Sequence, residues 1–351
     1  MDITEGDPEE IFDMLDKIGE GSYGIVCKCK RKSDGKLFAI KLIELEGEDD
    51  TAIRKEIDIL KACDSDLVVR YGGCYKKGST LLIAMEFCDG GSVQDLLRIA
   101  KLKMTEEQIA CICGQILEGL VYLHSHHIMH RDIKSGNILL TQSGAAKLAD
   151  FGVSARLQST FQKRATVIGS PYWMAPEIIA KSNEGYDSRA DIWSLGITAI
   201  EMADGVPPRY DIHFARVIFI IPQREPPTFK EEDKWSSEFR DFTSKCLQKD
   251  CTKRPTAKEL LQHPFIKKGR GKNQLIASLV TQALPVIEEH RAMVAAKESA
   301  EDDDDSGTIV KRVSTVEIRG GEGSSDTLVT NDKAGPNHIK GLDLSNVQTY
   351  M

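Results

Sequence analysis

The spacing of the apolar residues changes once along this chain, near residue 90, and this change limits its fold more than any other feature. From Phe12 to about Phe87, short alternating or β-branched runs are separated by turn signals, the clearest of which is Ser33-Asp34-Gly35-Lys36. A single helical stretch, Thr51 to Ala62, interrupts these runs. From Ser92 onward the spacing is helical. We therefore expect an α+β fold with two lobes: a small antiparallel sheet with one helix, followed by a larger and mainly helical lobe.

Three helices of the second part can be predicted individually. The helix from Thr105 to His124 opens with Thr105-Glu106-Glu107-Gln108, which fits a capping box. The stretch from Ala190 to Met202 is apolar nearly all round, which predicts a helix at the centre of the lobe. A further helix is predicted from about Asn273 to Lys297, and Pro285 is expected to kink it or to begin a new helix.

Changes in composition predict how the chain is divided. We expect an N-terminal extension at 1–11, the main domain at 12–266, a helical extension at 267–299 and an acidic tail at 300–351. A hinge near Glu86 to Gly90 divides the main domain into lobes at 12–88 and 89–266. The tail opens with Asp302-Asp303-Asp304-Asp305 and continues without hydrophobic periodicity, which is typical of disorder.

Composition excludes several classes of protein. The net charge of −8 argues against a nucleic-acid-binding protein, which carries a broad basic excess. No apolar run is long enough for a membrane helix, and the first residues are acidic, unlike a signal peptide. The nine cysteines show no CxxC spacing, so neither a disulfide framework nor a zinc site is indicated. We expect free thiols and a cytoplasmic location, with no membrane and no nucleic-acid partner.

A glycine-rich motif lies in the first lobe. Gly19-Glu20-Gly21-Ser22-Tyr23-Gly24 matches GxGxxG, which alone also fits an ordinary hairpin or a dinucleotide site. In a dinucleotide fold the last glycine opens a helix, and Glu44 would be the candidate for the acidic residue that follows. Here Ile25 to Cys29 alternates like a strand instead. A strand-loop-strand unit that brings backbone amides onto phosphates is the better interpretation.

A lysine stands in an apolar strand. Phe38-Ala39-Ile40-Lys41 places an ammonium where it is costly unless it has an anionic partner, although the side chain could also reach solvent. Glu56, on the short helix, is the candidate partner. A Lys41–Glu56 pair would hold the ammonium against the α- and β-phosphates of a nucleotide.

The most specific signal is His130-Arg131-Asp132-Ile133-Lys134-Ser135-Gly136-Asn137, followed by Asp150-Phe151-Gly152. Phosphoryl transfer needs Mg²⁺ to neutralise phosphate oxygens and a carboxylate to align the incoming hydroxyl. Asp150 and Asn137 fit as magnesium ligands, and Asp132 fits as the catalytic base. Lys134 can reach the phosphate that is transferred.

These motifs together resemble the eukaryotic protein kinases over about Phe12 to Ile266, and Lys134 at its position is typical of serine/threonine specificity. The residues that carry the resemblance are Gly19 to Val26, Lys41, Glu56, His130 to Asn137, Asp150 to Gly152 and Ala175-Pro176-Glu177. Two further stretches, Gly169 to Glu177 and Asp191 to Ile197, resemble the sterile-twenty group. Within this group the chain most resembles the Hippo-type branch, and the stretches that carry this resemblance are Cys63-Asp64-Ser65, Lys163 to Gly169 and Asp302 to Val310.

The resemblance implies a role for several residues. Thr166 falls where the branch is activated by phosphorylation, and Arg131 is the cation that would receive the phosphate. Ser170 falls where a hydroxyl faces the catalytic aspartate, and Glu177 and Arg254 should form a buried ion pair. The resemblance also places Met85 at the gatekeeper position before the hinge, whose backbone should hydrogen-bond the adenine. The residues implied to bind ATP are Ile18, Gly19, Glu20, Gly21, Ser22, Tyr23, Gly24, Val26, Ala39, Lys41, Met85, Glu86, Phe87 and Cys88.

The implied activity is transfer of the ATP γ-phosphoryl group to serine or threonine hydroxyls of proteins, with Mg²⁺, after phosphorylation of the chain's own activation loop. Hippo-like signalling would make a downstream kinase and adapter proteins the partners. The candidate threonines for adapter docking are Thr308, Thr315 and Thr327, and the alternative is that they are ordinary threonines of a disordered tail.

A catalytically silent pseudokinase is the alternative to an active enzyme, but it would lack a phosphate-handling residue. No helical dimerisation pattern follows Lys297, so the oligomeric state stays open.

Overall fold

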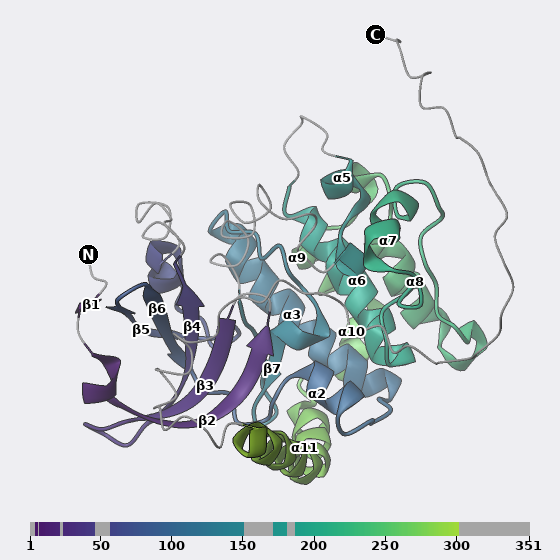
Figure 1. Cartoon of the computed structure of the whole chain (residues 1–351). Helices are drawn as coiled ribbons and strands as arrows, with labels where there is room; N and C mark the ends of the chain where they lie inside the picture. Colours follow the sequence, from purple (N-terminus) through teal and green to yellow (C-terminus); the bar gives the residue numbers. More distant parts are fainter. Residues whose placement is uncertain are drawn as a thin grey trace, which may run out of the picture. The chain divides into compact units, whose positions relative to one another are not determined.

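The computed structural model describes residues 4–5, 7–21, 24–45, 57–150, 171–180 and 187–301 (Figure 1). The chain divides into two compact units, 1–303 and 304–351, and every described residue belongs to the first. No helix among these residues is long and apolar enough to cross a membrane.

The first lobe is a twisted sheet of six strands. They are β1 (Thr4–Glu5), β2 (Phe12–Gly21), β3 (Gly24–Arg31), β4 (Leu37–Glu44), β5 (Tyr71–Lys77) and β6 (Thr80–Glu86). Their order is β1-β5-β6-β4-β3-β2, and every pair is antiparallel except β1 with β5. The predicted antiparallel sheet is confirmed. The short parallel strand β1 was not predicted, because two residues are too few to show a hydrophobic period.

Turn chemistry and burial explain the middle of this sheet. At the predicted hairpin turn, Gly35 has φ +71° and donates its N–H to the carbonyl of Arg31 at 2.8 Å. The left-handed φ suits glycine, which has no Cβ to clash. Strand β4 is one of the two central strands and is buried over most of its length. Residues 57–62 are helical, and the predicted beginning of that helix at Thr51 lies outside the described residues.

The second lobe is mainly helical, as predicted. Its elements are α2 (Val93–Arg98), α3 (Glu106–Ser125), the hairpin of β7 (Ile138–Leu140) and β8 (Ala146–Leu148), α5 (Pro176–Ile179), α6 (Arg189–Asp204), α7 (Phe214–Ile220), α8 (Ser237–Cys246), α9 (Ala257–Leu260) and α10 (Pro264–Gly269). Short 3₁₀ turns lie between them, including η2 (Ser135–Asn137) and η3 (Pro171–Trp173). Others are η1 (Pro8–Glu10) in the first lobe, η4 (Glu232–Lys234) and η5 (Cys251–Lys253).

Helices α3 and α6 form the centre of this lobe. The capping box of α3 is present: Thr105 N–H donates to Gln108 Oε1 at 2.7 Å, and Gln108 N–H donates to Thr105 Oγ1 at 3.3 Å. Every residue of α6 from Ala190 to Met202 is buried, and Gly205 ends the helix at φ +82°. The sequence predicted α3 from its regular helical period and α6 from an apolar run that covers nearly all sides of the helix.

Helix α11 (Asn273–Glu301) packs beneath α2 and α3 (Figure 1). It runs through Pro285 as one helix, so of the two outcomes expected at Pro285, a kink or a new helix, the second is wrong. Proline removes a single backbone donor, while Ala283 and Ile287, on either side, are both buried against the lobe. Tertiary packing therefore keeps the two halves of the helix together.

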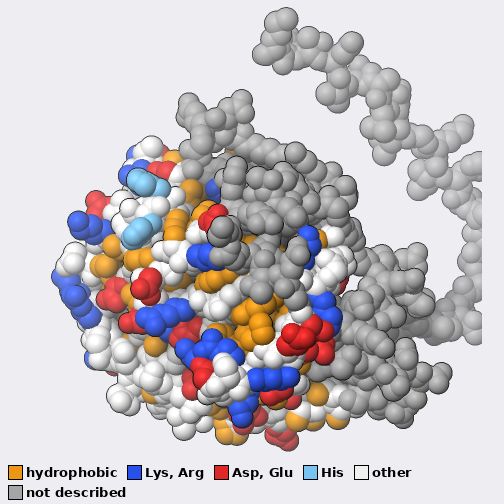
Figure 2. All heavy atoms as spheres, turned by 90° about the vertical axis from the view of Figure 1, so that its left-hand side faces the viewer, with side chains coloured by type: hydrophobic (Ala, Val, Ile, Leu, Met, Phe, Trp, Pro, Cys, Tyr) orange, Lys and Arg blue, Asp and Glu red, His pale blue; other side chains and the backbone are white. Residues whose placement is uncertain are grey.

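Charge is mixed on one face of the first unit. Figure 2 shows the face that lies at the left of Figure 1, where Lys and Arg side chains alternate with Asp and Glu. Across the described part of this face, no broad area carries a single sign of charge.

Candidate active site

The sheet register aligns the predicted nucleotide-binding residues. Gly19 pairs with Val26, Val26 with Lys41, and Lys41 with Ile83, so these positions form one row across β2, β3, β4 and β6. Ala39 pairs with Met85 two positions along β4 from Lys41, so this pair lies on the same face of the sheet as the Lys41 row. Of the glycine motif, Ser22 and Tyr23 lie outside the described residues, and Glu20 and Gly21 are described as strand backbone only. Ile18 belongs to the same strand, β2.

The segment Glu86 to Cys88 begins at the last residue of β6 and connects the two lobes. The Glu86 carboxylate accepts a hydrogen bond from Lys147 Nζ at 2.6 Å, so a side chain of β8 holds the end of β6. Cys88 is buried in a small cluster with Val69 and Ala149, against which Met85 packs. Phe87 lies under the ammonium of Lys28, 5.1 Å from its ring centroid. The hinge is therefore anchored by its side chains.

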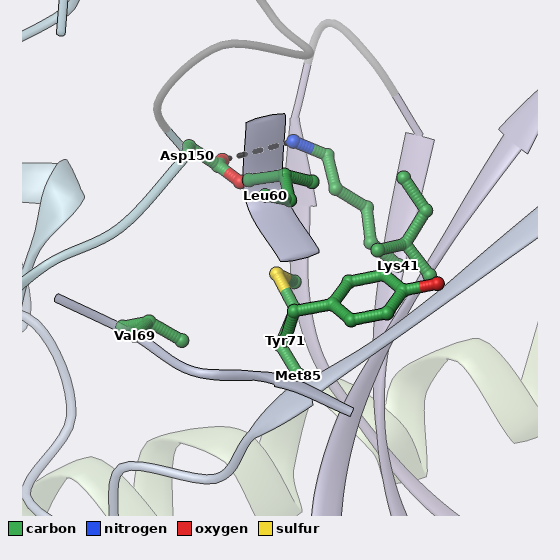
Figure 3. Close-up of a pocket in the computed structure, with 7 residues that line it drawn as sticks. Lys41, Leu60, Val69, Tyr71, Met85 and Asp150 are labelled. Carbon is green, nitrogen blue, oxygen red and sulfur yellow. Dashed lines mark ion pairs between the residues drawn. The ribbon is translucent and has the colours of Figure 1, made fainter. Parts of the chain in front are cut away.

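Lys41 and Asp150 meet between the lobes. Lys41 Nζ lies 2.9 Å from Asp150 Oδ2, and Figure 3 shows the two groups pointing toward each other above Leu60 and Met85. They line a pocket whose other walls are apolar. Burial raises the pKa of Asp150, but the charge and hydrogen bond of Lys41 outweigh this and hold the pKa below its ordinary value. Asp150 is consequently ionised and available to a cation at neutral pH.

The catalytic loop brings three predicted residues together. Asp132 Oδ2 accepts from Lys134 Nζ and from Asn137 Nδ2, each at 2.8 Å. Asn137 Nδ2 also donates to the Asp132 carbonyl at 2.7 Å. A carboxylate held on one side by an ammonium and on another by an amide has a restricted orientation. The aspartate is therefore positioned before any substrate arrives.

A buried acid that the sequence did not assign holds this loop in place. Asp191, in α6, accepts from Arg131 N–H at 2.8 Å, His130 N–H at 2.9 Å and His124 Nε2 at 2.8 Å. Arg131 has φ +70°, a left-handed conformation that is costly for a side chain with a Cβ. Burial raises the pKa of Asp191, but His124 and the other hydrogen-bond donors lower it by more, so its pKa lies below the ordinary value.

The geometry is that of a two-lobed phosphotransfer enzyme, and a comparison of sequences identifies the family. The protein kinase domain family matches residues 12–266. The chain belongs to the protein kinase family. Two relatives from Dictyostelium discoideum are the serine/threonine-protein kinase dst4, 52% identical over 294 residues, and the serine/threonine-protein kinase dst3, 47% identical over 328 residues. This agrees with the predicted membership of the sterile-twenty group of serine/threonine kinases.

The two alignments cover different shares of the proteins. They include 83% and 90% of this chain, but 61% and 58% of the relatives. This kinase chain therefore spans less than two thirds of the length of either relative.

A second unassigned acid of this kinase connects two parts of the site. Glu201, also in α6, accepts from Ser135 Oγ at 2.6 Å, Ser135 N–H at 3.2 Å and Trp173 Nε1 at 3.0 Å. It is fully buried, and burial raises its pKa although the hydrogen bonds act in the opposite direction. Its contacts tie the catalytic loop to η3, at the end of the activation segment. Arg98 Nη2 approaches it to 4.0 Å.

The activation segment is described only at its end. Thr166 and Ser170 lie outside the described residues, as do Phe151 and Gly152, and so does Glu56, the predicted partner of Lys41. The predicted Glu177–Arg254 pair is present and bidentate, with Nη1–Oε1 at 2.7 Å and Nη2–Oε2 at 3.1 Å. Arg254 is buried, so this pair fixes the chain that follows the segment.

The residues present fit a magnesium site. Asp150 supplies an ionised carboxylate, and Asn137, whose amide nitrogen is bound to Asp132, can present its carboxamide oxygen to a cation. Among the described residues no group of three or more His, Cys, Asp or Glu could hold a metal. In enzymes of this kind Mg²⁺ usually has one or two protein ligands, together with phosphate oxygens and water.

Proposed function

We propose that this kinase transfers the γ-phosphoryl group of ATP to serine and threonine hydroxyls of other proteins. The observation that supports this most is the Asp132 carboxylate, held by Lys134 and Asn137 in the same loop, while the charge of Lys134 also acts on Asp150 of the Lys41–Asp150 pair. Positioning and charge stabilisation provide most of the rate in phosphoryl transfer, and this arrangement provides both.

The reaction places Asp132 beside the acceptor hydroxyl. The hydroxyl oxygen forms a bond to the γ-phosphorus, the bond from that phosphorus to the bridging oxygen of ADP breaks, and the hydroxyl proton passes to the Asp132 carboxylate. The Lys134 ammonium, 2.8 Å from Asp132 Oδ2, is placed to stabilise the charge on the phosphoryl oxygens. Mg²⁺, held by Asn137 and Asp150, would neutralise phosphate charge.

The first lobe binds and orients the nucleotide in this proposal. Backbone groups of Glu86 to Cys88 bond the adenine, and the glycine loop from Gly19 to Gly24 covers the phosphates. Apolar walls come from Val26, Ala39 and Met85, which pair across the strands of the sheet, and from Ile18 of β2. Lys41 reaches the α- and β-phosphates, with Glu56 as its second anionic partner.

We also propose activation by phosphorylation of Thr166. A phosphate there adds a charge near −2 and strong acceptors, and Arg131, exposed beside Asp132, is the cation to receive it. Ser170 would then face Asp132.

A Hippo-like role, with a downstream kinase and adapter proteins as partners and a cytoplasmic location, rests on the resemblance of the sequence to the Hippo-type branch. The buried free cysteines are compatible with a reducing compartment.

The test is transfer of labelled γ-phosphate to a generic basic protein in the presence of Mg²⁺. We expect incorporation on serine and threonine by the parent chain, and a loss of about 10²- to 10⁴-fold in kcat for Asp132→Asn. Asp241→Asn, a surface change in α8, serves as the control and should have no effect. Full activity of Asp132→Asn would refute the proposal.

A further inference from the structure

Helix α11 lies outside the matched kinase domain and yet packs on it. The family match ends at residue 266, whereas α11 begins at Asn273. The helix runs beneath α2, the first helix after the hinge (Figure 1). Its inner face is buried in the core of the second lobe, through Ile276, Val280, Ala283 and Ile287. Apolar burial therefore holds this added helix firmly against the lobe.

The second half of α11 reaches the chain that leaves the hinge. We call Gly90, Gly91 and Ser92 the hinge exit. Gly91 has φ +74°, and a Cβ placed on it would lie 3.7 Å from Ile287 Cδ1. Ile287 is fully buried, so this side chain of α11 fills the space beside the hinge exit. A shift of α11 would consequently leave the hinge exit without support there.

The hinge exit is also bonded to β7. Gly90 N–H donates to the Leu140 carbonyl at 2.9 Å, and Leu140 N–H donates to the Gly91 carbonyl at 2.8 Å. Two elements, β7 and α11, thus determine where the chain runs after the hinge.

An ion pair between α11 and α2 acts on the same segment. Arg291 Nη2 lies 3.3 Å from Asp95 Oδ2, and the two side chains are 29% and 22% exposed. The same oxygen of Asp95 accepts from Ser92 N–H at 2.9 Å, and Ser92 Oγ accepts from Asp95 N–H at 3.0 Å. These two bonds are the capping box of α2. Arg291 therefore orients the carboxylate that binds the backbone of the hinge exit.

We propose that α11 sets the affinity of this kinase for nucleotide by fixing the hinge exit, with Arg291 as the positioning residue. The inference rests on the proposed function, in which backbone groups of Glu86 to Cys88 bond the adenine. Gly90 follows Cys88 by two residues, so a shift of the hinge exit moves those groups away from the adenine.

The catalytic loop should not follow this movement. Asp191 of α6 binds the backbone N–H groups of His130 and Arg131, independently of α11. Loss of the Arg291 contact is therefore expected to change nucleotide binding and to leave the phosphoryl-transfer step unaltered.

The experiment measures nucleotide binding separately from phosphoryl transfer, on the full chain. Titration calorimetry gives the Kd for Mg-ADP, and steady-state kinetics with a basic protein as acceptor give kcat and the KM for Mg-ATP. We expect Arg291→Ala to raise both Kd and KM about fivefold, since a partly exposed ion pair is of modest strength, and to leave kcat unchanged. All measurements are made well below the Tm of every variant.

The matched control is Lys272→Ala. Lys272 Nζ also lies 3.3 Å from its acidic partner, Glu107 Oε2, but Lys272 precedes the first residue of α11, at the end of the helix far from Arg291. Its loss should leave Kd and KM at the parental values.

A second variant tests whether Arg291 acts through Asp95. Asp95→Ala removes the carboxylate from both the ion pair and the capping box, so we expect a larger rise in Kd than with Arg291→Ala. Arg291→Ala added to Asp95→Ala should raise Kd no further, because the arginine has already lost its partner. A full additional rise in the double variant would overturn the inference.

The remaining outcomes separate the two proposals. If the parent binds no Mg-ADP and transfers no phosphate, the proposed function fails. If the parent does both, but Arg291→Ala has the parental Kd, the α11 inference is overturned. It is equally overturned if Lys272→Ala raises Kd as much as Arg291→Ala, because the contact then stabilises the lobe in general. A fall in kcat with unchanged KM in Arg291→Ala would also overturn it, because the helix would then act on the catalytic loop.

Discussion

Replacing Asp191 with asparagine tests whether α6 positions the catalytic loop. The two carboxylate oxygens of Asp191 accept from Arg131 N–H, His130 N–H and His124 Nε2. Asparagine has the same shape but offers one oxygen, and its NH₂ group must face at least one of these donors. Whichever way the amide turns, a backbone N–H of the loop loses a charged acceptor.

The expected cost follows from those contacts. A hydrogen bond to a charged group contributes roughly 1.5–3 kcal/mol, and a buried donor left without an acceptor costs roughly 1–3 kcal/mol. We expect the free energy of unfolding to fall by about 3 kcal/mol and Tm by roughly 6–12 °C. Arg131, at φ +70°, would relax, and Asp132 beside it would move. A displacement of about 1 Å can reduce kcat about 10²-fold.

Two measurements on the same preparation distinguish positioning from stability. Denaturant unfolding gives the change in free energy, and steady-state kinetics give kcat and the KM for ATP well below Tm. We expect a large fall in kcat with little change in the KM for ATP. Asp241→Asn is the matched control, because Asp241 also accepts from a histidine, His263 Nε2 at 2.9 Å, but is half exposed. A destabilised Asp191→Asn with unchanged kcat would refute the positioning role.

The pH dependence of stability tests the direction of the Asp191 pKa shift independently. The pKa of Asp191 lies below its ordinary 3.8, so the unfolded chain binds the proton more tightly than the folded chain. The stabilisation is present above about pH 4 and is lost as the pH falls through the folded pKa. The difference in unfolding free energy between parent and Asp191→Asn should therefore shrink below that pH. A difference that grows on acidification would contradict the assigned pKa shift.

Three further substitutions test other contacts. Lys41→Met should raise the pKa of Asp150 from its lowered value, because the ammonium no longer offsets the effect of burial. An unchanged carboxyl titration by NMR would count against the pair. Glu177→Ala should lower the free energy of unfolding, measured with denaturant, by about 3–5 kcal/mol, because Arg254 stays buried without its partner. A loss below about 1 kcal/mol would show that the pair is dispensable. Gly144→Ala should lower Tm, because the added Cβ would lie 2.1 Å from the carbonyl oxygen of Asn273, the first residue of α11, and because the φ of Gly144 is +87°. An unchanged Tm would mean that α11 can move away from the added methyl group without cost.

Local patterns predicted most of the fold. The period of α3 and its capping box at Thr105 lie within neighbouring residues, and so does the apolar run of α6. The continuity of α11 through Pro285 depends on packing against other helices, which local spacing does not report. Strand β1 depends on an edge offered by β5, far along the chain.

The candidate site likewise contains residues that local sequence predicted and residues that only the folded chain brings together. The loop that contains Asp132, Lys134 and Asn137 is compact in sequence, so its motif already implied that these residues lie together. Asp191 and Glu201 act on residues of the catalytic loop that lie sixty or more positions away, and no motif spacing connects them. One signal could have found them: an acid within an otherwise apolar helix is costly to bury and must have partners.

The central claim is that Asp132 directs phosphate from ATP to serine and threonine hydroxyls. Mass spectrometry of the purified full chain before and after incubation with Mg-ATP, beside the Asp132→Asn chain, tests it most directly. The account predicts new phosphate on Thr166 in the parent and none in the variant. Equal phosphorylation of both chains, or none in the parent even with a basic protein added as acceptor, would contradict it.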